Sequence, residues 1–365
     1  MAHGCQYVHN FNNTGIKIMK VTKQYLVIPI FSVVCGAQAD NMPLLNPDLN
    51  AQTVYAGAAL TTGAGAYVGG SLQAIQAATL GAHSEIEGNL ATGGPITLTA
   101  STKVSQDVTA GTALTLGDNA LVIGNLLTGT GSITLGGMAE VRGTATRATS
   151  ITISATASVN HIQQRNPELY EASEPPGSQQ KQLGDAQIAL KLMETIPDNE
   201  LATTLTVNTT FGPGVYHAAG LTTTAGIIIR LEGNLDEFKH TVPSLWVFNI
   251  DSYLAFGAGN IIELVNVHPE STIIWNTGTY ISTGAGAMVR GTFIAGTYVT
   301  TGAGTILAGI SDGGACDAIF ATNEAVTLGA GTRLENFDCT TAVGGVNTIF
   351  VGTDGIAKFD GTVIN

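Results

Sequence analysis

Apolar and polar positions alternate along most of this chain in short runs that recur at a regular spacing. The unit is clearest at Ile281, where I-S-T-G-A-G-A-M-V-R-G recurs at Val299 as V-T-T-G-A-G-T-I-L-A-G. Related units, with a nearly constant 18-residue step between their starts, begin at Leu60, Ala78, Ile96, Leu114, Ile133 and Ile151. This regular repeat predicts a solenoid, because one unit cannot bury its own apolar face and must stack on its neighbours.

Each unit predicts three short strands. If its first residue is position zero, positions zero, +2, +8 and +12 should face inward, because side chains alternate across a strand. Position +8 is occupied by Val68, Ile86, Val104, Val122, Val141 and Val159, and position +12 by Leu72, Leu90, Val108, Leu126 and Ala145. The G-A-G and G-G pairs between strands supply corners that often need a positive φ. They are not a dinucleotide-binding loop, which requires a helix directly afterwards.

The repeats divide the chain into segments. After a Pro/Asn-rich lead-in, residues 40–160 are expected to form N-terminal coils, and residues 201–365 less regular C-terminal coils of the same domain. Between them, residues 161–200 are a polar connector followed by one long helix over 181–196, which Pro197 ends. Its apolar face at helical spacing comprises Leu183, Ala186, Ala189, Leu190 and Met193. We expect this helix to lie against the side of the solenoid.

Residues 1–39 have the pattern of a leader. A short basic segment containing Lys20 and Lys23 precedes the apolar run 25–34, and Ala37-Gln38-Ala39 is typical of a cleavage site. We expect a secreted, extracellular protein with a mature start near Asp40. The alternatives are a periplasmic location or attachment to the cell surface, the latter including lipidation at Cys35. The apolar run is too short to span a bilayer, so no membrane insertion is expected.

Composition narrows the range of partners. Only 11% of the 365 residues are charged and the net charge is -13, which argues against nucleic acid as a partner. Processing would leave two cysteines, Cys316 and Cys339. In an exported protein such a pair more often forms a disulfide than a reactive or metal site.

The second half carries an ordered series of motifs: D-A-Q-I-A from Asp185, P-G-V-Y from Pro213, W-V-F-N-I from Trp246, I-W-N-T-G from Ile274, G-T-F-I-A-G-T from Gly291 and A-V-T-L from Ala325. Over residues 181–336 this series resembles the secreted ice-binding (antifreeze) proteins of the DUF3494 family. The resemblance implies an all-β-dominated, discontinuous β-solenoid with a flanking α-helix, in which stacking order departs from sequence order. It also implies ice as the partner, while residues 55–160 are longer and more regular than the family's usual opening coils.

Position +1 points outward and carries a hydroxyl in every aligned unit: Thr61, Thr79, Thr97, Thr115, Thr134, Thr152, Ser282, Thr300 and Thr327. Stacked coils lie about 4.7–4.9 Å apart, so these residues should form a straight ladder suited to ordered water. A second hydroxyl, just before some units, could widen it, at Thr112, Thr149, Thr279 and Thr297. Threonine is also common on exposed strands for structural reasons. The +1 column, however, lacks the charges found at +7 and +9, such as Glu85, Lys103 and Arg142.

Enzymatic chemistry has little support in the sequence. The histidines after residue 40 lie far apart without ligand spacing, and we expect them to be structural or on the surface: His83, His161, His217, His240 and His268. We expect a monomer that is not an enzyme and needs no cofactor or metal. The alternatives are a secreted polysaccharide-binding or polysaccharide-acting β-helix, which needs acidic or basic groups in register, and a structural or adhesive solenoid similar to bactofilins.

Overall fold

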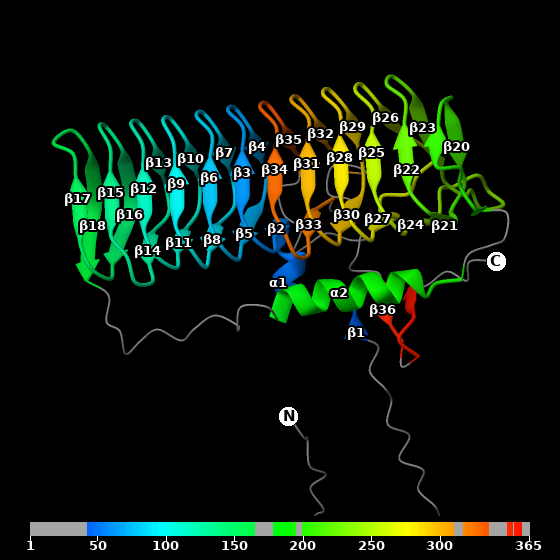
Figure 1. The fold of residues 1–365 in the computed structure, drawn as a ribbon, viewed down its shortest axis with the longest axis horizontal. Coiled ribbons are helices and arrows are strands. Elements are labelled where there is room, and N and C mark those ends of the chain that lie inside the picture. The colour runs from blue at the N-terminus through cyan, green and yellow to red at the C-terminus, as the bar shows by residue number, and fades with distance from the viewer. Residues whose placement is uncertain are drawn as a thin grey trace, which may run out of the picture. The chain divides into compact units, whose positions relative to one another are not determined.

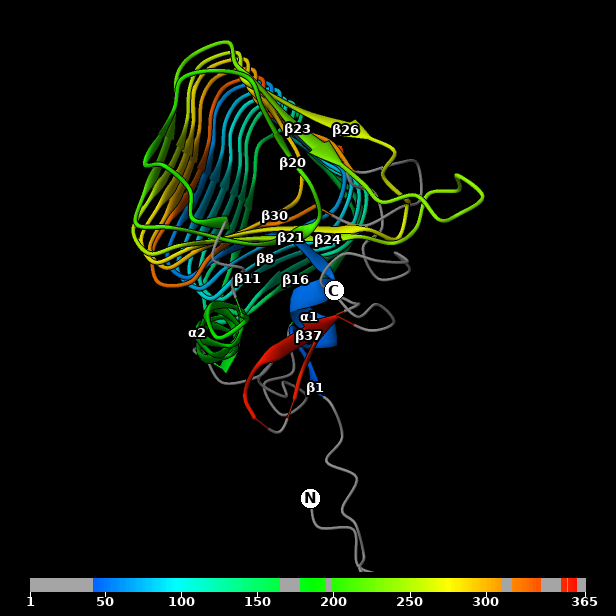
Figure 2. The ribbon, with the colours of Figure 1, turned by 90° about the vertical axis from the view of Figure 1, so that its right-hand side faces the viewer.

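The computed structural model describes residues 42–164, 178–194, 199–309, 317–335, 349–352 and 354–359, all within the compact unit Ala39–Asn365. The leader, Pro197, Cys316 and Cys339 lie outside the described residues, so the expected disulfide stays a prediction. Most described residues form parallel strands stacked into a solenoid with three sides (Figures 1 and 2). The predicted solenoid of repeated three-strand coils with a helix alongside is confirmed.

The first side is a parallel sheet of twelve short strands. In the N-terminal half these are β3 (Leu60–Thr62), β6 (Ala78–Leu80), β9 (Ile96–Leu98), β12 (Leu114–Leu116), β15 (Ile133–Leu135) and β17 (Ile151–Ile153). In the C-terminal half they are β19 (Thr204–Leu205), β22 (Leu221–Thr223), β25 (Leu254–Phe256), β28 (Ile281–Thr283), β31 (Val299–Thr301) and β34 (Val326–Leu328). Each strand begins at position zero of its coil, except β19.

The other two sides together form a 22-stranded sheet. The second side contains β4 (Tyr67–Val68), β7 (Glu85–Ile86), β10 (Lys103–Val104), β13 (Leu121–Val122), β20 (Thr209–Phe211), β23 (Ile228–Glu232), β26 (Ile261–Val265), β29 (Met288–Val289), β32 (Ile306–Leu307) and β35 (Arg333–Leu334). The third contains β2 (Gln52–Ala56), β5 (Ser71–Ala74), β8 (Leu90–Thr92), β11 (Val108–Ala110), β14 (Leu126–Thr128), β21 (Gly214–Ala218), β24 (Leu245–Ile250), β27 (Thr272–Thr277), β30 (Thr292–Ala295) and β33 (Ile319–Ala321). Two longer strands, β16 (Glu140–Arg147) and β18 (Ser158–Gln164), contribute to both sides.

The two halves of the chain meet in the middle of the stack. Strand β3 pairs with β6 on one side and with β34 on the other, so the first and last regular coils are neighbours. From β3 the chain winds outward to β17, and from β19 at the opposite end it winds back to β34. Figure 1 shows this as an abrupt change from blue to orange strands within one continuous row. The expected departure of stacking order from sequence order is confirmed.

The core fills the inside of the coils. Side chains at position +8 are buried from Val68 to Val141 and those at position +12 from Leu72 to Ala145, while Val159 in the terminal coil is half-buried. The C-terminal coils add stacked aromatic rings: Trp275 lies 4.0 Å from Phe248 and 6.2 Å from Phe293 between ring centroids. Alternation along each strand therefore predicted the interior correctly.

Helix α2 (Ser178–Lys191) lies along the third side. Leu183, Ala186, Ala189, Leu190 and Met193 are buried against that side, as predicted. The predicted bounds are wrong, because the helix both begins and ends earlier than the expected range 181–196. Gln179 explains the early start, because its side-chain oxygen accepts a 2.8 Å hydrogen bond from Gln73 on β5.

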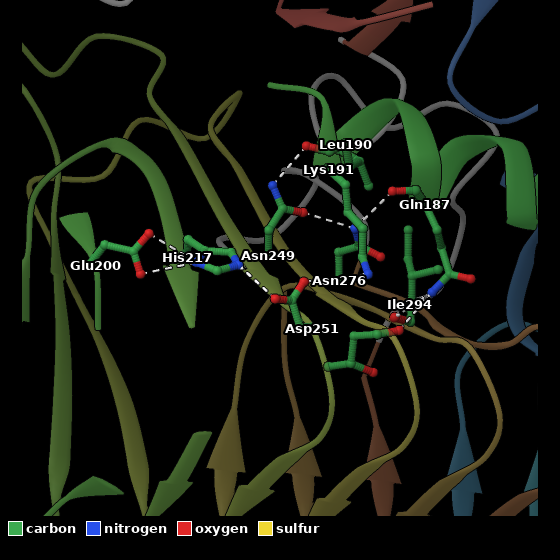
Figure 3. Close-up of polar contacts among 10 residues, drawn as sticks. Gln187, Leu190, Lys191, Glu200, His217, Asn249, Asp251, Asn276 and Ile294 are labelled. Carbon is green, nitrogen blue, oxygen red and sulfur yellow. Dashed lines mark hydrogen bonds and ion pairs between the residues drawn. The ribbon is translucent and has the colours of Figure 1, made fainter. Parts of the chain in front are cut away.

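Asparagine side chains join the end of the helix to the sheet (Figure 3). Asn249 on β24 donates to the Leu190 carbonyl oxygen at 2.7 Å, and Asn276 on β27 donates to the Gln187 carbonyl oxygen at 3.1 Å. Asn276 also donates to the Asn249 side-chain oxygen at 2.9 Å. These asparagines come from the W-V-F-N-I and I-W-N-T-G motifs, which therefore dock the helix.

A small module lies beside the third side (Figure 2). The lead-in contains a second helix, α1 (Pro47–Asn50), whose first turn is capped by the Asn46 side chain. An antiparallel sheet joins β1 (Met42–Pro43) to β36 (Ile349–Val351) and β37 (Ala357–Phe359). The sequence pattern does not predict this short helix, because the signal for α1 is a single Asn-Pro capping pair rather than an apolar period.

One corner position is strained in four of the N-terminal coils, where His83, Ser101, Asn119 and Met138 have positive φ. The C-terminal coils place glycine there, for example Gly286 and Gly304, at φ 68° and 67°, whereas Met138 occupies it at φ 56° and is 61% exposed. A left-handed conformation costs a residue with a Cβ about 1–2 kcal/mol, and glycine recovers most of this. We expect Met138→Gly to raise the free energy of unfolding by about 1 kcal/mol in denaturant titrations. The reverse change, Gly304→Met, should lower it, and equal stabilities for all three proteins would contradict the strain.

The buried carboxyl of Asp317 makes stability depend on pH. Burial raises its pKa from 3.8 to about 7, against smaller opposing effects of the Gly291 backbone N–H and the Arg290 charge. The folded protein then keeps a proton that the unfolded chain releases, so stability should fall as pH rises from about 4 to about 7, by on the order of a few kcal/mol. Denaturant midpoints measured from pH 4 to pH 8 should show a steeper loss for the native protein than for Asp317→Asn. Parallel curves for the two proteins would rule out this contribution.

Candidate functional site

The predicted +1 residues lie in one column on the first side of the solenoid. Strand register links each member to the next across all twelve strands. In stacking order the column, called here the threonine column, is Thr152, Thr134, Thr115, Thr97, Thr79, Thr61, Thr327, Thr300, Ser282, Ala255, Thr222 and Thr204. At the usual strand spacing it is about 50 Å long. Eleven of its twelve members carry a hydroxyl.

The structure adds three members that the sequence reasoning missed. Ala255, Thr222 and Thr204 lie in coils that depart from the regular repeat, since an insertion separates Leu221 from Leu254 in the sequence although they begin neighbouring strands. The regular members lie in a short apolar–hydroxyl–apolar triplet, such as L-T-L at Leu114. The similar triplet L-T-T at Leu221 was the sequence signal that could have identified Thr222. Ala255 is the one member without a hydroxyl.

Every member of the threonine column reaches solvent. Thr61, Thr79, Thr115, Thr134 and Thr152 are exposed, and the remaining predicted members are partly exposed. Their neighbours along each strand point inward and are mostly buried, as the alternation of β3 and β12 shows. The column contains no charged residue. It is therefore an uncharged row of hydroxyl and methyl groups held by parallel strands.

The second hydroxyl column is not continuous. Backbone hydrogen bonds place Thr279 beside Thr297, but they place Glu324 and Ala58 next in the row. Thr112 and Thr149 are each bonded through the backbone to a glycine, Gly94 and Gly131. The second hydroxyl is therefore confined to individual coils, because insertions and substitutions at the corner change this position from coil to coil, and its part in the site stays a prediction.

The second side of the solenoid carries mixed charges that pair with each other. Lys103 contacts Glu85 and Glu87, and the Arg142 and Glu140 side chains lie 2.8 Å apart. In the C-terminal half, Arg230 contacts Glu263 across neighbouring strands at 2.9 Å. These four glutamates thus have basic partners, which is typical of a solvated surface rather than a carboxylate pair for glycan cleavage.

His217 is the histidine with the strongest polar contacts. Its Nδ1 lies 3.0 Å from both Glu200 carboxylate oxygens, and its Nε2 lies 3.0 Å from Asp251 Oδ2 (Figure 3). The Glu200 hydrogen bond, followed by that to Asp251, raises the pKa of His217 above its ordinary value. Lys191 at the end of α2 lies 3.7 Å from Asp251 Oδ1. Because both ring nitrogens face carboxylates, this group ties β21, β24 and α2 together.

The described part of the chain contains neither a metal-binding cluster nor a membrane-spanning helix. Within it, no cluster of three or more histidine, cysteine, aspartate or glutamate residues is arranged to hold a metal ion. No helix among these residues has the length and apolar character needed to cross a membrane.

One segment of the chain matches a known protein family. Residues 168–333 match the family described as Ice-binding-like. Over this segment the chain resembles the ice-binding-like family. The ice-binding-like segment contains α2, both docking asparagines and the strands that supply Thr204, Thr222, Ala255, Ser282, Thr300 and Thr327. The family resemblance over 181–336 is confirmed, and coils β3 to β17 lie before the matched segment.

Similar solved structures include an ice-binding protein from the Antarctic ascomycete Antarctomyces psychrotrophicus, at 14% identity and TM-score 0.43, covering 80% of this chain and 98% of that one. Another is the DUF3494 domain of an ice-binding protein from Shewanella frigidimarina, at 17% identity and TM-score 0.44, covering 80% and 96%. An ice-binding protein from an Arctic yeast matches at 18% identity and TM-score 0.35, covering 63% and 89%. Comparison with curated protein sequences finds no match.

Proposed function

We propose that this protein adsorbs to ice through the threonine column and so restrains the growth and recrystallisation of ice. The observation that carries the proposal is the register of the column: eleven hydroxyls in twelve successive coils, without a charge. The match of residues 168–333 to the ice-binding-like family supports the same function. The protein acts by adsorption rather than catalysis, as a monomer without a cofactor, outside the cell.

The chemistry of the column suits ordered water. Threonine has a stiff χ1, so its hydroxyl and methyl groups lose little freedom when they meet a regular lattice. Each methyl removed from liquid water contributes about 0.8 kcal/mol. Parallel strands repeat these groups at one spacing along the column, so a flat ice surface can contact many at once. Single contacts are weak, and their number gives lasting adsorption.

A polysaccharide remains the alternative partner. Such a function needs open acidic or basic groups in register, whereas Lys103, Arg142 and Arg230 pair with carboxylates on the second side. The described residues therefore favour ice.

Ice partitioning tests the proposed function. A cooled probe is used to grow ice slowly in a dilute solution of the protein mixed with a labelled globular protein of similar size. The proposal predicts that this protein is enriched in the ice fraction while the labelled protein stays in the liquid. Exclusion of both proteins to the same extent would overturn the proposal.

A further inference from the structure

A second column of residues runs beside the threonine column. Its members precede the first residue of each strand, and their backbone carbonyl oxygens accept hydrogen bonds from the first strand residue of the neighbouring coil. In stacking order this border column is Ser150, Ser132, Ala113, Pro95, Ala77, Ala59, Ala325, Tyr298, Tyr280 and Tyr253. Seven successive coils thus have a small or compact border residue, and the next three have tyrosine.

The three tyrosines form one stack. The ring centroids of Tyr298 and Tyr280 lie 5.0 Å apart with an interplanar angle of 3°, and those of Tyr280 and Tyr253 lie 5.4 Å apart at 10°. The stack continues over Gly220, where a Cβ would come within 3.3 Å of the Tyr253 ring. Mutual stacking fixes the rings in place, so they form a rigid aromatic edge.

The threonine column itself changes where this edge begins. Each of the seven coils with a small border residue carries threonine, and five of these threonines are exposed. In the three coils bordered by tyrosine the members are Thr300, Ser282 and Ala255, all only partly exposed. Ser282 lacks the methyl group and Ala255 lacks the hydroxyl. Two independent features, the border and the column, therefore change at the same coils.

We propose that ice contact is confined to the seven coils from Thr152 to Thr327 and ends at the tyrosine edge. A phenol ring beside the column extends well beyond an alanine methyl and keeps a flat lattice away from the neighbouring short side chains. This inference rests on the proposed function and locates its site. Six of the seven contact threonines then precede the ice-binding-like segment of residues 168–333.

Matched substitutions at the two ends of the column test this inference. Thr79→Tyr places a ring among the coils that have a small border residue, whereas Ser282→Tyr places the same ring beside Tyr280. The readout is the lowest protein concentration that stops recrystallisation in a frozen sucrose solution. Thr79→Tyr should raise that concentration by about four- to fifteenfold, the loss of one to two methyl contacts, and Ser282→Tyr should leave it within about twofold.

Two further variants guard against a folding defect. Thr134→Tyr should behave like Thr79→Tyr, and Thr222→Tyr should behave like Ser282→Tyr, with thermal unfolding confirming that each protein folds. If Ser282→Tyr and Thr222→Tyr lose as much activity as Thr79→Tyr, the confinement is wrong and the whole column binds. If all four retain full activity, neither part of the column contacts ice. An inactive native protein would instead overturn the proposed function itself.

Discussion

Replacing Thr115 and Thr134 together with tyrosine should weaken ice adsorption about a hundredfold while leaving the fold intact. The two residues are exposed neighbours in the threonine column, paired in register between β12 and β15. Two protruding rings would hold the ice away from these residues and from the adjoining Thr97 and Thr152. Losing about four methyl contacts costs roughly 3 kcal/mol, which corresponds to about a hundredfold in affinity.

The matched control for this double variant is Leu121→Tyr. Leu121 lies on β13 in the same coil as Thr115, but on the second side, where it is partly exposed. It introduces a ring without touching the column, so its recrystallisation endpoint should equal that of the native protein. If the control loses activity as well, the effect of the double variant comes from a disturbed coil and the column loses its assigned role.

Among the substitutions expected to affect stability, removing the side chain of Asn249 should lower the free energy of unfolding most. This residue is buried, donates to the Leu190 carbonyl oxygen and accepts from Asn276. Asn249→Ala leaves the helix carbonyl without its partner in a site that excludes water. An unsatisfied buried polar group costs about 1–3 kcal/mol, and two broken hydrogen bonds put the expected loss at about 3 kcal/mol. Denaturant titration followed by circular dichroism measures it.

Asn160→Ala is the comparison for the asparagine variant. Asn160 is exposed on the terminal strand β18, so its removal should change stability by no more than about 0.5 kcal/mol. Similar small losses for both variants would mean that the asparagine contacts do not hold α2 on the sheet.

The regular coils could be predicted from the sequence because each repeats the same alternation. Val104, Leu72 and Thr115 occupy inward, inward and outward positions dictated by side-chain alternation across a strand. The helix face around Leu183 and Leu190 followed from its helical period. Local pattern therefore determines which way a side chain points, even without knowledge of the neighbouring coil.

Stacking order could not be predicted from local pattern. Any coil with the right period offers the same strand edges, so nothing near Leu60 indicates that Val326 is its neighbour. The family resemblance implied only that stacking order departs from sequence order. Irregular insertions hid Thr204, Thr222 and Ala255 for a related reason, since they interrupt the regular repeat around these positions. The roles of Asn249 and Asn276 depend on where α2 returns along the stack, which only the folded structure defines.

The tyrosine edge shows how one site depends on contacts between distant segments. Each tyrosine precedes a strand in the sequence, as in T-Y-I-S-T at Thr279 and T-Y-V-T-T at Thr297. The pattern is visible, but its meaning requires that Tyr253, Tyr280 and Tyr298 stack on the same side as the threonines. The structure supplies the stacking through the ring geometry, and the backbone hydrogen bonds place the three residues in one column beside the threonines.

Growth of a single ice crystal tests the central claim most directly. One crystal is held slightly below its melting point in the native protein, in the Thr115→Tyr, Thr134→Tyr variant and in Leu121→Tyr at equal concentration. Adsorption through the threonine column predicts faceted crystals with the native protein and Leu121→Tyr, and round discs with the double variant. Round discs in all three solutions would contradict ice adsorption, and facets in all three would contradict the threonine column as the surface that binds.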